Sequence, residues 1–511
     1  MEAGDEERSQ PHVAIVPTPG MGHLFPLIEF TKRLVVQHNF LVTFIIANDG
    51  KSSIELQEKL LQSLPKPISY TFLPPINLDD LPEDSAIETR IELSLTRSLP
   101  SLRETLESMA ESTQLVSIVV DIFGPCTFDM AKELGIPPYI YFPTTAMVLS
   151  FFLYLPKLDA TTACEYRDLP ELVQIPGCFP VQGHKLFDVL QNRKSEPYKA
   201  FVHMANRYYQ ADGIMVNSFF ELQPGAFKAL KERVLGNPLV YSVGPMVRFG
   251  STSDGDEKSE CLTWLDKQPT SSVLFVSFGT GGTLSQEQLT QLALGLEKSG
   301  QRFVWVVKSP NDKSSSATYF SVQSKQNPLD FLPDGFLERT KEVGLVVPSW
   351  APQVKILNHG SIGGFLTHCG WNSTLESILS GVPLIAWPLF AEQKFNSILV
   401  CEELKVGLKA KKNEKGIVED EEIAKLVREL MEGEEGKVLR KKMKELQEAS
   451  KVALSDEGSS TKTLAEVVHF SSIVRPFLPN FLKFVLDCPF FFVLLSNSCN
   501  VTNFGEIIYQ L

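Results

Sequence analysis

A histidine, a glycine and small polar residues follow an apolar run in the segment Phe365–Glu376, which reads FLTHCGWNSTLE. The apolar run predicts a buried strand, and the residues after it have a helical pattern. The first turn of a helix presents unpaired N–H groups and the positive end of the helix dipole, so anions bind there readily. Gly370 lets the backbone approach such an anion, and His368 and Ser373 can add donors. A second glycine-rich turn, SFGTGGT (277–283), also follows an apolar run and could close over the same anion.

The same segment also has a purely structural interpretation. Ser373 and Glu376 have the S-x-x-E spacing of a helix capping box, and Gly381 has the place of a helix end. A well-capped helix between two buried strands accounts for these residues. It does not account for His368 or Trp371, because neither capping nor core packing requires them.

Two further polar residues, His23 and Asp121, lie at the ends of apolar runs in the first half of the chain. The runs are VAIVP (13–17) and LVSIVVD (115–121). If both are parallel strands, their carboxyl ends meet at one edge of a sheet. A histidine and a carboxylate at one edge indicate a general base and the group that orients it. The alternative is that the histidine is a structural group with satisfied hydrogen bonds.

The turn after the first run contains a partial dinucleotide-binding motif. Gly20 and Gly22 provide the first two glycines, but Phe25 occupies the position of the third. The acidic residue expected about 20 residues further on, at the end of the next strand, is matched only loosely by Asn48-Asp49. An NAD-dependent oxidoreductase is therefore disfavoured.

The composition is that of a globular protein with an acidic surface. The chain has 511 residues, 43% of them hydrophobic and 21% charged, with a formal net charge of −13. This length favours two domains, and the negative charge argues against nucleic acid or an anionic membrane as a partner. The acidic first ten residues predict no secretory signal, and the eight cysteines form no C-x-x-C pair. We therefore expect a cytoplasmic protein with reduced thiols.

Apolar runs alternate with helical patterns along both halves of the chain. The runs lie at 13–17, 41–47, 115–121, 138–143, 213–219, 272–279, 302–308, 344–350, 363–370 and 382–387. Continuous β-branched or aromatic runs are typical of parallel strands buried on both faces. Among the helical patterns, 286–300 ends at Gly300. The alternation predicts an α/β fold with two Rossmann-like, doubly wound domains facing each other across a cleft.

Changes in composition predict the domain boundaries. Residues 1–245 are expected to form the N-terminal domain, the Gly/Ser-rich segment 246–260 a linker, and residues 261–469 the C-terminal domain. A polar insertion at about 309–329 has the composition of a surface loop. The Phe-rich tail 470–511 is interrupted by charges and prolines, so no stable membrane insertion is expected.

A long stretch of the second half carries a resemblance to a known family. Residues 350–393, WAPQVKILNHGSIGGFLTHCGWNSTLESILSGVPLIAWPLFAEQ, closely resemble the signature box of plant secondary-product UDP-glycosyltransferases, which are family 1 glycosyltransferases. The resemblance extends from about residue 11 to 468. PTPGMGHLFPL, VVDIFG and FLPPINLDDL are similar to the hydroquinone or arbutin synthase-like group, which glucosylates small phenols. The resemblance implies the GT-B fold.

The resemblance also implies a set of residues that bind the UDP-sugar. These residues are Ser277, Thr280, Trp350, Ala351, Gln353, His368, Trp371, Asn372, Ser373, Glu376, Glu392 and Gln393. In the family pattern, the residue at Trp350 stacks on uracil and that at Glu376 holds the ribose hydroxyls. The residue at His368 contacts the diphosphate, and those at Glu392 and Gln393 contact the glucose hydroxyls. A glutamine at position 393 is similar to glucose-preferring members.

For the acceptor, the resemblance implies that His23 and Asp121 are the catalytic pair. His23 would remove the proton of an acceptor hydroxyl while Asp121 orients the imidazole. Attack on the anomeric carbon of UDP-α-glucose from the face opposite to UDP would give a β-O-glucoside. The acceptor pocket is expected to contain Glu88, and Phe123, Phe142 and the apolar segment 149–158 are expected to form its walls. The alternative for Glu88 is a solvated residue on a helix face.

The resemblance implies no cofactor, and UDP-glucose is the donor substrate. We expect no metal, because the helix dipole, His368 and Ser373 can meet the charge of the leaving diphosphate. The D-x-D motif Asp254-Gly255-Asp256 lies in the predicted linker and has the character of a solvated acidic run. We expect a monomer that takes a small phenolic acceptor. The tail from residue 470 departs from the family pattern, which leaves a catalytically impaired nucleotide-sugar-binding relative as the alternative.

Overall fold

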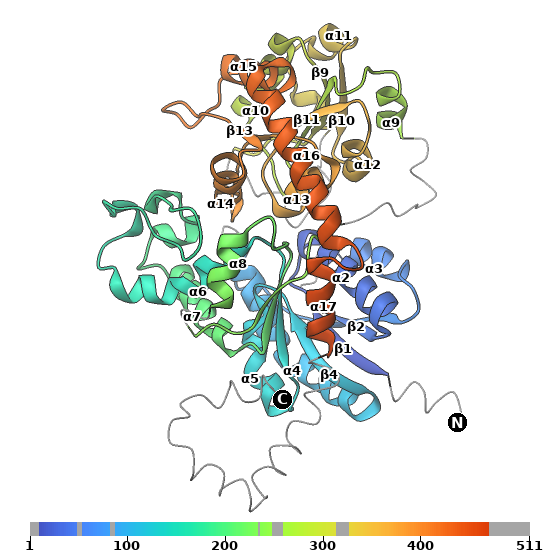
Figure 1. The fold of residues 1–511 in the computed structure, drawn as a ribbon, viewed down its shortest axis with the longest axis vertical. Helices are drawn as coiled ribbons and strands as arrows, with labels where there is room; N and C mark the ends of the chain where they lie inside the picture. The colour runs from blue at the N-terminus through green and yellow to red at the C-terminus, as the bar shows by residue number, and fades with distance from the viewer. Residues whose placement is uncertain are drawn as a thin grey trace, which may run out of the picture. The chain divides into compact units, whose positions relative to one another are not determined.

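Two parallel β-sheets, each with helices around it, make up this computed structural model of the protein (Figure 1). The structure describes residues 10–48, 54–81, 87–232, 236–247, 259–312 and 327–469. Both sheets belong to one compact unit, Met1–Leu464. The D-x-D motif, most of the polar insertion and the tail from residue 470 lie outside the described residues, so the predictions made for them stay predictions.

The first sheet has seven parallel strands in the described part of the chain, in the order β3-β2-β1-β4-β5-β6-β7. The strands are β1 Pro11–Val16, β2 Leu41–Asn48, β3 Ile68–Pro75, β4 Gln114–Val120, β5 Pro138–Phe142, β6 Gly213–Val216 and β7 Val240–Ser242. The helices around it are α2 Met21–His38, α3 Ile54–Gln62, α4 Ile87–Ser112, α5 Phe128–Glu133, α6 Ala146–Thr161, α7 Glu196–Arg207 and α8 Pro224–Lys231. The strand order reverses between β1 and β4, where a crevice forms at the carboxyl ends of such strands.

The second sheet has six parallel strands among the described residues, in the order β10-β9-β8-β11-β12-β13. The strands are β8 Val273–Ser277, β9 Arg302–Val307, β10 Gly344–Pro348, β11 Ile362–Thr367, β12 Leu384–Ala386 and β13 Gly407–Lys409. The helices that follow in the chain are α9 Glu260–Leu265, α10 Gln286–Ser299, α11 Phe336–Thr340, α12 Gln353–Leu357, α13 Trp371–Ser380, α14 Gln393–Ile398, α15 Asp420–Glu432, α16 Glu434–Leu454 and α17 Ser459–His469. Its order reverses between β8 and β11.

The predicted elements agree well with these two sheets. Each of the ten apolar runs overlaps one of the strands, and the α/β class with two Rossmann-like sheets is confirmed. The helix predicted at 286–300 is α10, whose N-cap Ser285 accepts a hydrogen bond from the Gln288 backbone N–H. Its C-cap Gly300 adopts φ 67°, a conformation that glycine reaches without steric cost.

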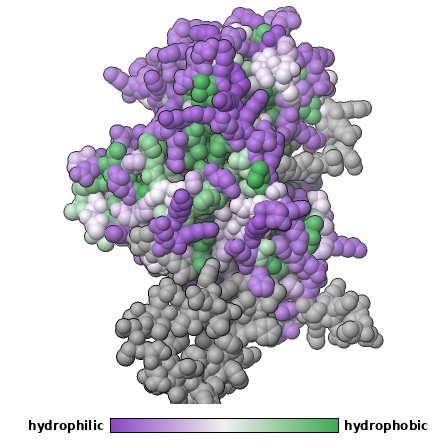
Figure 2. Space-filling view, in the orientation of Figure 1, coloured by the Kyte–Doolittle hydropathy of each residue, from purple (hydrophilic) through white to green (hydrophobic). Residues whose placement is uncertain are grey.

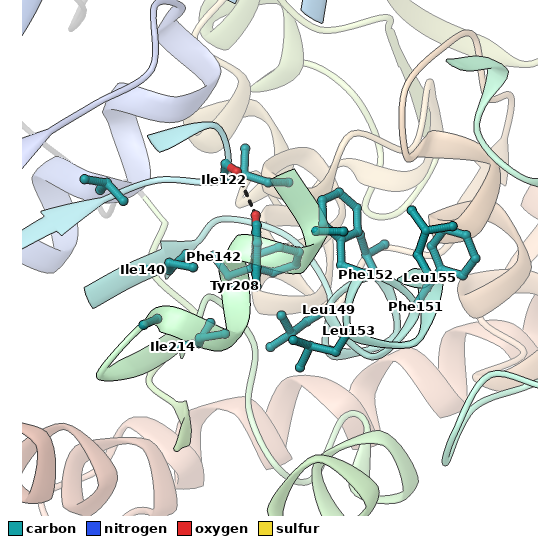
Figure 3. Close-up of a cluster of buried hydrophobic side chains, with 14 of the residues drawn as sticks. Ile122, Ile140, Phe142, Leu149, Phe151, Phe152, Leu153, Leu155, Tyr208 and Ile214 are labelled. Carbon is teal, nitrogen blue, oxygen red and sulfur yellow. Dashed lines mark hydrogen bonds between the residues drawn. The ribbon is translucent and has the colours of Figure 1, made fainter. Parts of the chain in front are cut away.

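The core of the first sheet fixes the loop that follows β4 (Figure 3). Helix α6 is apolar on nearly all sides, and its Phe152 packs against β5 and Tyr208. Phe142 of β5 contacts Phe152 and Tyr208, with ring centroids 5.7 and 6.0 Å apart. Burying one such ring contributes roughly 1.5–3 kcal/mol to folding. The Tyr208 hydroxyl donates to the Ile122 carbonyl at 2.7 Å, which holds the backbone beside Asp121 in place.

Hydrophilic residues cover most of the visible face, and hydrophobic ones gather in patches near the middle of the view (Figure 2). Few large apolar side chains of the described residues are strongly exposed; one of them is Trp350, at 51%. In the part of the chain that the structure describes, every helix is too short or too polar to cross a membrane.

Candidate active site

His23 and Asp121 meet at the edge where the order of the first sheet reverses. His23 lies in the first turn of α2, just after β1, and Asp121 directly follows β4. The register of the two strands pairs Val16 with Val120, so the segments that follow β1 and β4 leave the sheet at the same level. His23 Nδ1 lies 3.0 Å from Asp121 Oδ2. The contact has the distance of an ion pair, although Nδ1 lacks a well-aligned hydrogen bond among the described residues.

Thr18, which was not predicted, fixes the Asp121 carboxylate from the opposite side. The Thr18 backbone N–H donates to Oδ2 at 2.8 Å, and its hydroxyl donates to Oδ1. Asp121 is fully buried, so these two donors replace the water that would otherwise solvate its charge. They also hold Oδ2 at the imidazole. The pair therefore has the arrangement of a base oriented by a carboxylate, with Nε2 left for another proton partner.

The surroundings of His23 favour its protonated form. Burial by itself lowers the pKa of the imidazole, but the charges of Asp121 and Glu392 outweigh it, so the pKa is raised above 6.5. A base with a raised pKa loses its neutral form sooner as the pH falls. We therefore expect the acid limb of kcat/KM to have a midpoint above pH 6.5, measured from about pH 5 to about pH 9. A midpoint at or below that of free imidazole would contradict this electrostatic description.

A cavity of about 570 Å³ joins the two sheets at this edge. Among the predicted site residues, those that line it are His23, Glu88, Phe123, Ser277, Thr280, Trp350, Ala351, Gln353, His368, Trp371, Asn372, Ser373, Glu376, Glu392 and Gln393. Asp121 lies behind His23 and does not line it. Phe142 does not line it either: its side chain is fully buried in the core against α6, so the expectation that it forms an acceptor wall is wrong.

The second sheet brings three predicted nucleotide contacts together at the start of α13. Gln353 Nε2 donates to Ser373 Oγ at 2.9 Å and to Glu376 Oε2 at 2.7 Å. The predicted capping box is wrong, because α13 begins at Trp371 with Gly370 as its N-cap. Ser373 and Glu376 therefore lie inside the helix. Both polar side chains face Gln353 and the cavity instead of closing the helix end.

Two glycines leave room for the His368 imidazole beside this helix. A Cβ placed on Gly279 would lie 2.5 Å from His368 Cε1, and one on Gly370 would lie 2.4 Å from Nε2. Burial, and then the charge of Lys308, lower the pKa of His368 to about 3. The imidazole is therefore neutral and offers a hydrogen-bonding nitrogen without a charge. The His368 imidazole lies beside the 277–283 turn, where the anion site is predicted.

Replacing Gly279 by alanine should disturb the donor half of the site. Its φ of +70° already costs alanine roughly 1–2 kcal/mol, and the new methyl would also displace His368. We expect UDP-glucose affinity to fall about 10- to 100-fold, since small displacements at such sites are costly. Gly300→Ala is the matched control, because Gly300 has φ +67° and nothing within 4 Å of an added Cβ. Calorimetric titration that finds equal donor affinity in the two variants would contradict the prediction.

Trp371 and Asn372 connect the second sheet to loops of the first. The Trp371 indole Nε1 donates to the Asn217 carbonyl at 2.7 Å. The Asn372 side chain donates to the Gly22 carbonyl at 2.8 Å, next to His23, while its buried Oδ1 has no partner among the described residues. The two residues therefore hold the start of α13 against the loop that carries His23.

Glu392 and Gln393 lie at the start of α14, on the cavity side. The Gln393 side-chain carbonyl accepts hydrogen bonds from the backbone N–H groups of Leu389 and Phe390, at 2.8 and 3.0 Å, which shape this turn. Glu392 is half-buried, and the desolvation of its carboxyl group raises its pKa. Its charge nevertheless acts on His23, so the two side chains share one region of the cavity.

Aromatic and aliphatic side chains of the first sheet form the other end of the cavity. Phe123 lies beside His23 with ring centroids 6.2 Å apart, and Glu88 lines the cavity from α4. Phe152, from the predicted apolar segment 149–158, also lines the cavity. Sequence reasoning missed several further wall residues, namely Ile91, Thr144, Val148, Phe187 and Phe201. Thr144 is buried, and its hydroxyl has no partner within the described ranges. Its position just after β5, like that of Asp121 after β4, is a signal that could have found it.

The described residues include no group of three or more His, Cys, Asp or Glu arranged to hold a metal ion. The polar groups that line the cavity are instead hydroxyls, amides, two imidazoles, single carboxylates and two lysines. Such groups can bind a nucleotide sugar through hydrogen bonds and can move one proton at His23.

Two Rossmann-like sheets with a cavity between them are the architecture of the GT-B class of glycosyltransferases. The family model described as UDP-glucoronosyl and UDP-glucosyl transferase matches residues 250–447. The chain is also similar to hydroquinone glucosyltransferase of Rauvolfia serpentina, with 57% identity over 457 residues, which cover 89% of this chain and 97% of the relative. The chain therefore belongs to the UDP-glycosyltransferase family.

Solved structures agree with this assignment. Phytolacca americana UGT2 complexed with UDP-2fluoro-glucose and pterostilbene is 48% identical, with a TM-score of 0.83 over 92% of this chain and 99% of that one. A UDP-glucosyltransferase from Polygonum tinctorium, capable of glucosylating indoxyl and solved with 3,4-dichloroaniline, is 50% identical. Its TM-score is 0.84, covering 90% of this chain and 98% of the other.

Proposed function

We propose that the protein transfers glucose from UDP-glucose to the hydroxyl of a small phenol and inverts the anomeric configuration. The observation that carries this proposal is the His23–Asp121 pair, 3.0 Å apart, on the cavity that Gln353, Ser373 and Glu376 also line. The names of the relatives support the choice of donor and of a hydroquinone-like acceptor.

In the proposed reaction, His23 Nε2 takes the proton of the phenol hydroxyl while Nδ1 faces Asp121. The phenolic oxygen forms a bond to the anomeric carbon, and the bond from that carbon to the UDP oxygen breaks, giving a β-glucoside and UDP. A phenol suits this base, because its pKa of about 10, like that of tyrosine, makes it far easier to ionise than an alkyl alcohol. Asp121 stabilises the imidazolium until the proton leaves.

The donor half has to stabilise the charge of the departing diphosphate. The first N–H groups of α13 face that charge, and Ser277, Thr280, His368 and Ser373 add neutral donors nearby. We propose that these groups are sufficient without a metal ion. Trp350, half exposed at the cavity mouth, offers a flat surface for the base.

The apolar wall of the acceptor half supports the proposal of an aromatic acceptor. Phe123, Phe152, Phe187 and Phe201 present ring surfaces, and His23 provides the proton acceptor at one end. An aromatic alcohol can bury its ring there while its hydroxyl meets the imidazole. Glu88 is placed to accept a hydrogen bond from a second polar group, such as the other hydroxyl of hydroquinone.

The test is incubation of the purified protein with UDP-glucose and a panel of hydroquinone, a chlorinated phenol and an aliphatic alcohol, in EDTA. We expect UDP and a β-glucoside, identified by mass spectrometry and by the anomeric proton coupling in NMR. Phenols should react faster than the aliphatic alcohol. Saturable UDP-glucose binding without any glucoside would instead support the impaired relative, and an α-glucoside would contradict inversion.

A further inference from the structure

Lys308 is a cation in the cavity to which the sequence assigned no role. It directly follows β9 and lines the same cavity as Ser277, Thr280 and His368. Its ammonium donates to the Thr280 carbonyl, and its charge acts on the His368 imidazole. Lys308 therefore lies where the 277–283 turn and the residues before α13 come together.

The positive charge of Lys308 has no carboxylate to balance it in the described part of the chain. Burial lowers its pKa to about 8, and no acidic neighbour acts in the opposite direction. Ser277 and Thr280 are uncharged, and His368 is neutral because its pKa is lowered to about 3. Lys355, the other lysine on the cavity, lies on α12 and has an interaction of its own. Lys308 is half-buried, and a partly desolvated cation without a counter-charge is unfavourable unless a ligand supplies the anion.

We propose that Lys308 binds the diphosphate of UDP-glucose and stabilises the charge that the leaving UDP gains, an inference that rests on the proposed function. A lysine ammonium is a compact point charge with three donors, which suits phosphate oxygens. The charge on the diphosphate rises as the bond to the anomeric carbon breaks. Because the Thr280 carbonyl already holds the ammonium in place, the ammonium can stabilise the charge of the leaving diphosphate without rearrangement.

The test compares UDP with uridine, which lacks the diphosphate. In Lys308→Met we expect UDP affinity, measured by calorimetry, to fall roughly 30-fold or more, because a buried charge pair loses one partner. Uridine affinity should stay within about twofold of wild type, since Trp350 and Glu376 are untouched. The kcat for glucosylation should also fall. Lys308→Arg keeps the positive charge and should recover part of both losses.

The matched control is Lys341→Met, which removes an exposed lysine paired with Glu338 on α11. Lys341→Met should leave the UDP affinity, the uridine affinity and kcat unchanged. If Lys308→Met binds UDP as wild type does, the inference is overturned. It is also overturned if UDP and uridine weaken equally, because Lys308 would then only support the Thr280 turn. A wild-type protein that binds neither UDP nor UDP-glucose would contradict the proposed function itself. That result differs from one in which wild type and Lys308→Met both bind UDP with the same affinity, which overturns only the inference about Lys308.

Discussion

Replacing His23 by alanine should lower kcat for glucosylation by about 10²- to 10⁴-fold, the usual contribution of a general base. The phenol would then have to lose its proton to water, because His23 is the imidazole that faces Asp121. UDP-glucose affinity should stay within a few-fold of wild type, since the donor residues lie on the other sheet. Initial rates with hydroquinone and calorimetric titration of UDP-glucose measure the two effects separately.

His184→Ala is the matched control, because this histidine is exposed and does not line the cavity. It should leave both the rate and the affinity unchanged. If His23→Ala keeps a third or more of the wild-type rate, the base is some other group. If the UDP-glucose affinity of His23→Ala falls by as large a factor as its kcat, His23 acts mainly in binding.

Asp121→Asn should lower kcat by a similar factor, about 10²- to 10⁴-fold, with little change in folding. The amide has nearly the shape of the carboxylate, and its one oxygen can keep one of the two Thr18 contacts. It cannot stabilise the imidazolium, however, and its NH2 group can favour the wrong tautomer of His23. Because the Asp121 charge raises the pKa of His23, the acid limb of kcat/KM should also move to lower pH.

Asp266→Asn provides the comparison, since Asp266 also contacts a histidine, His359, at 3.1 Å but on the surface. It should leave both the rate and the pH profile unchanged. An Asp121→Asn variant with a normal rate and an unshifted acid limb would show that the carboxylate has only a structural role. The double variant with Asp121→Asn and His23→Ala should have a kcat close to that of His23→Ala alone, because the two residues act as one unit.

The positions of the strands could be predicted from sequence, because a strand buried on both faces must be a continuous apolar run. VAIVP overlaps most of β1, and LVSIVVD overlaps most of β4 and ends with Asp121, directly after that strand. Parallel strands place their carboxyl ends together, so the meeting of His23 and Asp121 followed from their positions alone. The donor residues were predicted by resemblance, and all of the predicted residues line the cavity.

Side-chain direction was the part that sequence could not supply. Phe142 and Phe152 are both apolar residues near the cavity, yet the pleat of β5 turns the first into the core while α6 presents the second to the cavity. Phe187 and Phe201 come from distant segments that only the folded chain brings together. The start of α13 was misplaced because Ser373 and Glu376 fit a capping box by spacing, whereas the helix begins earlier, after Gly370.

The most direct measurement is a crystal structure of the protein with hydroquinone and a UDP-glucose analogue that cannot react. We expect the acceptor oxygen at about 3 Å from His23 Nε2 and at about 3–3.5 Å from the anomeric carbon. We also expect the diphosphate at the start of α13, beside Lys308. A phenol held away from His23, or a diphosphate bound elsewhere in the cavity, would contradict these expectations.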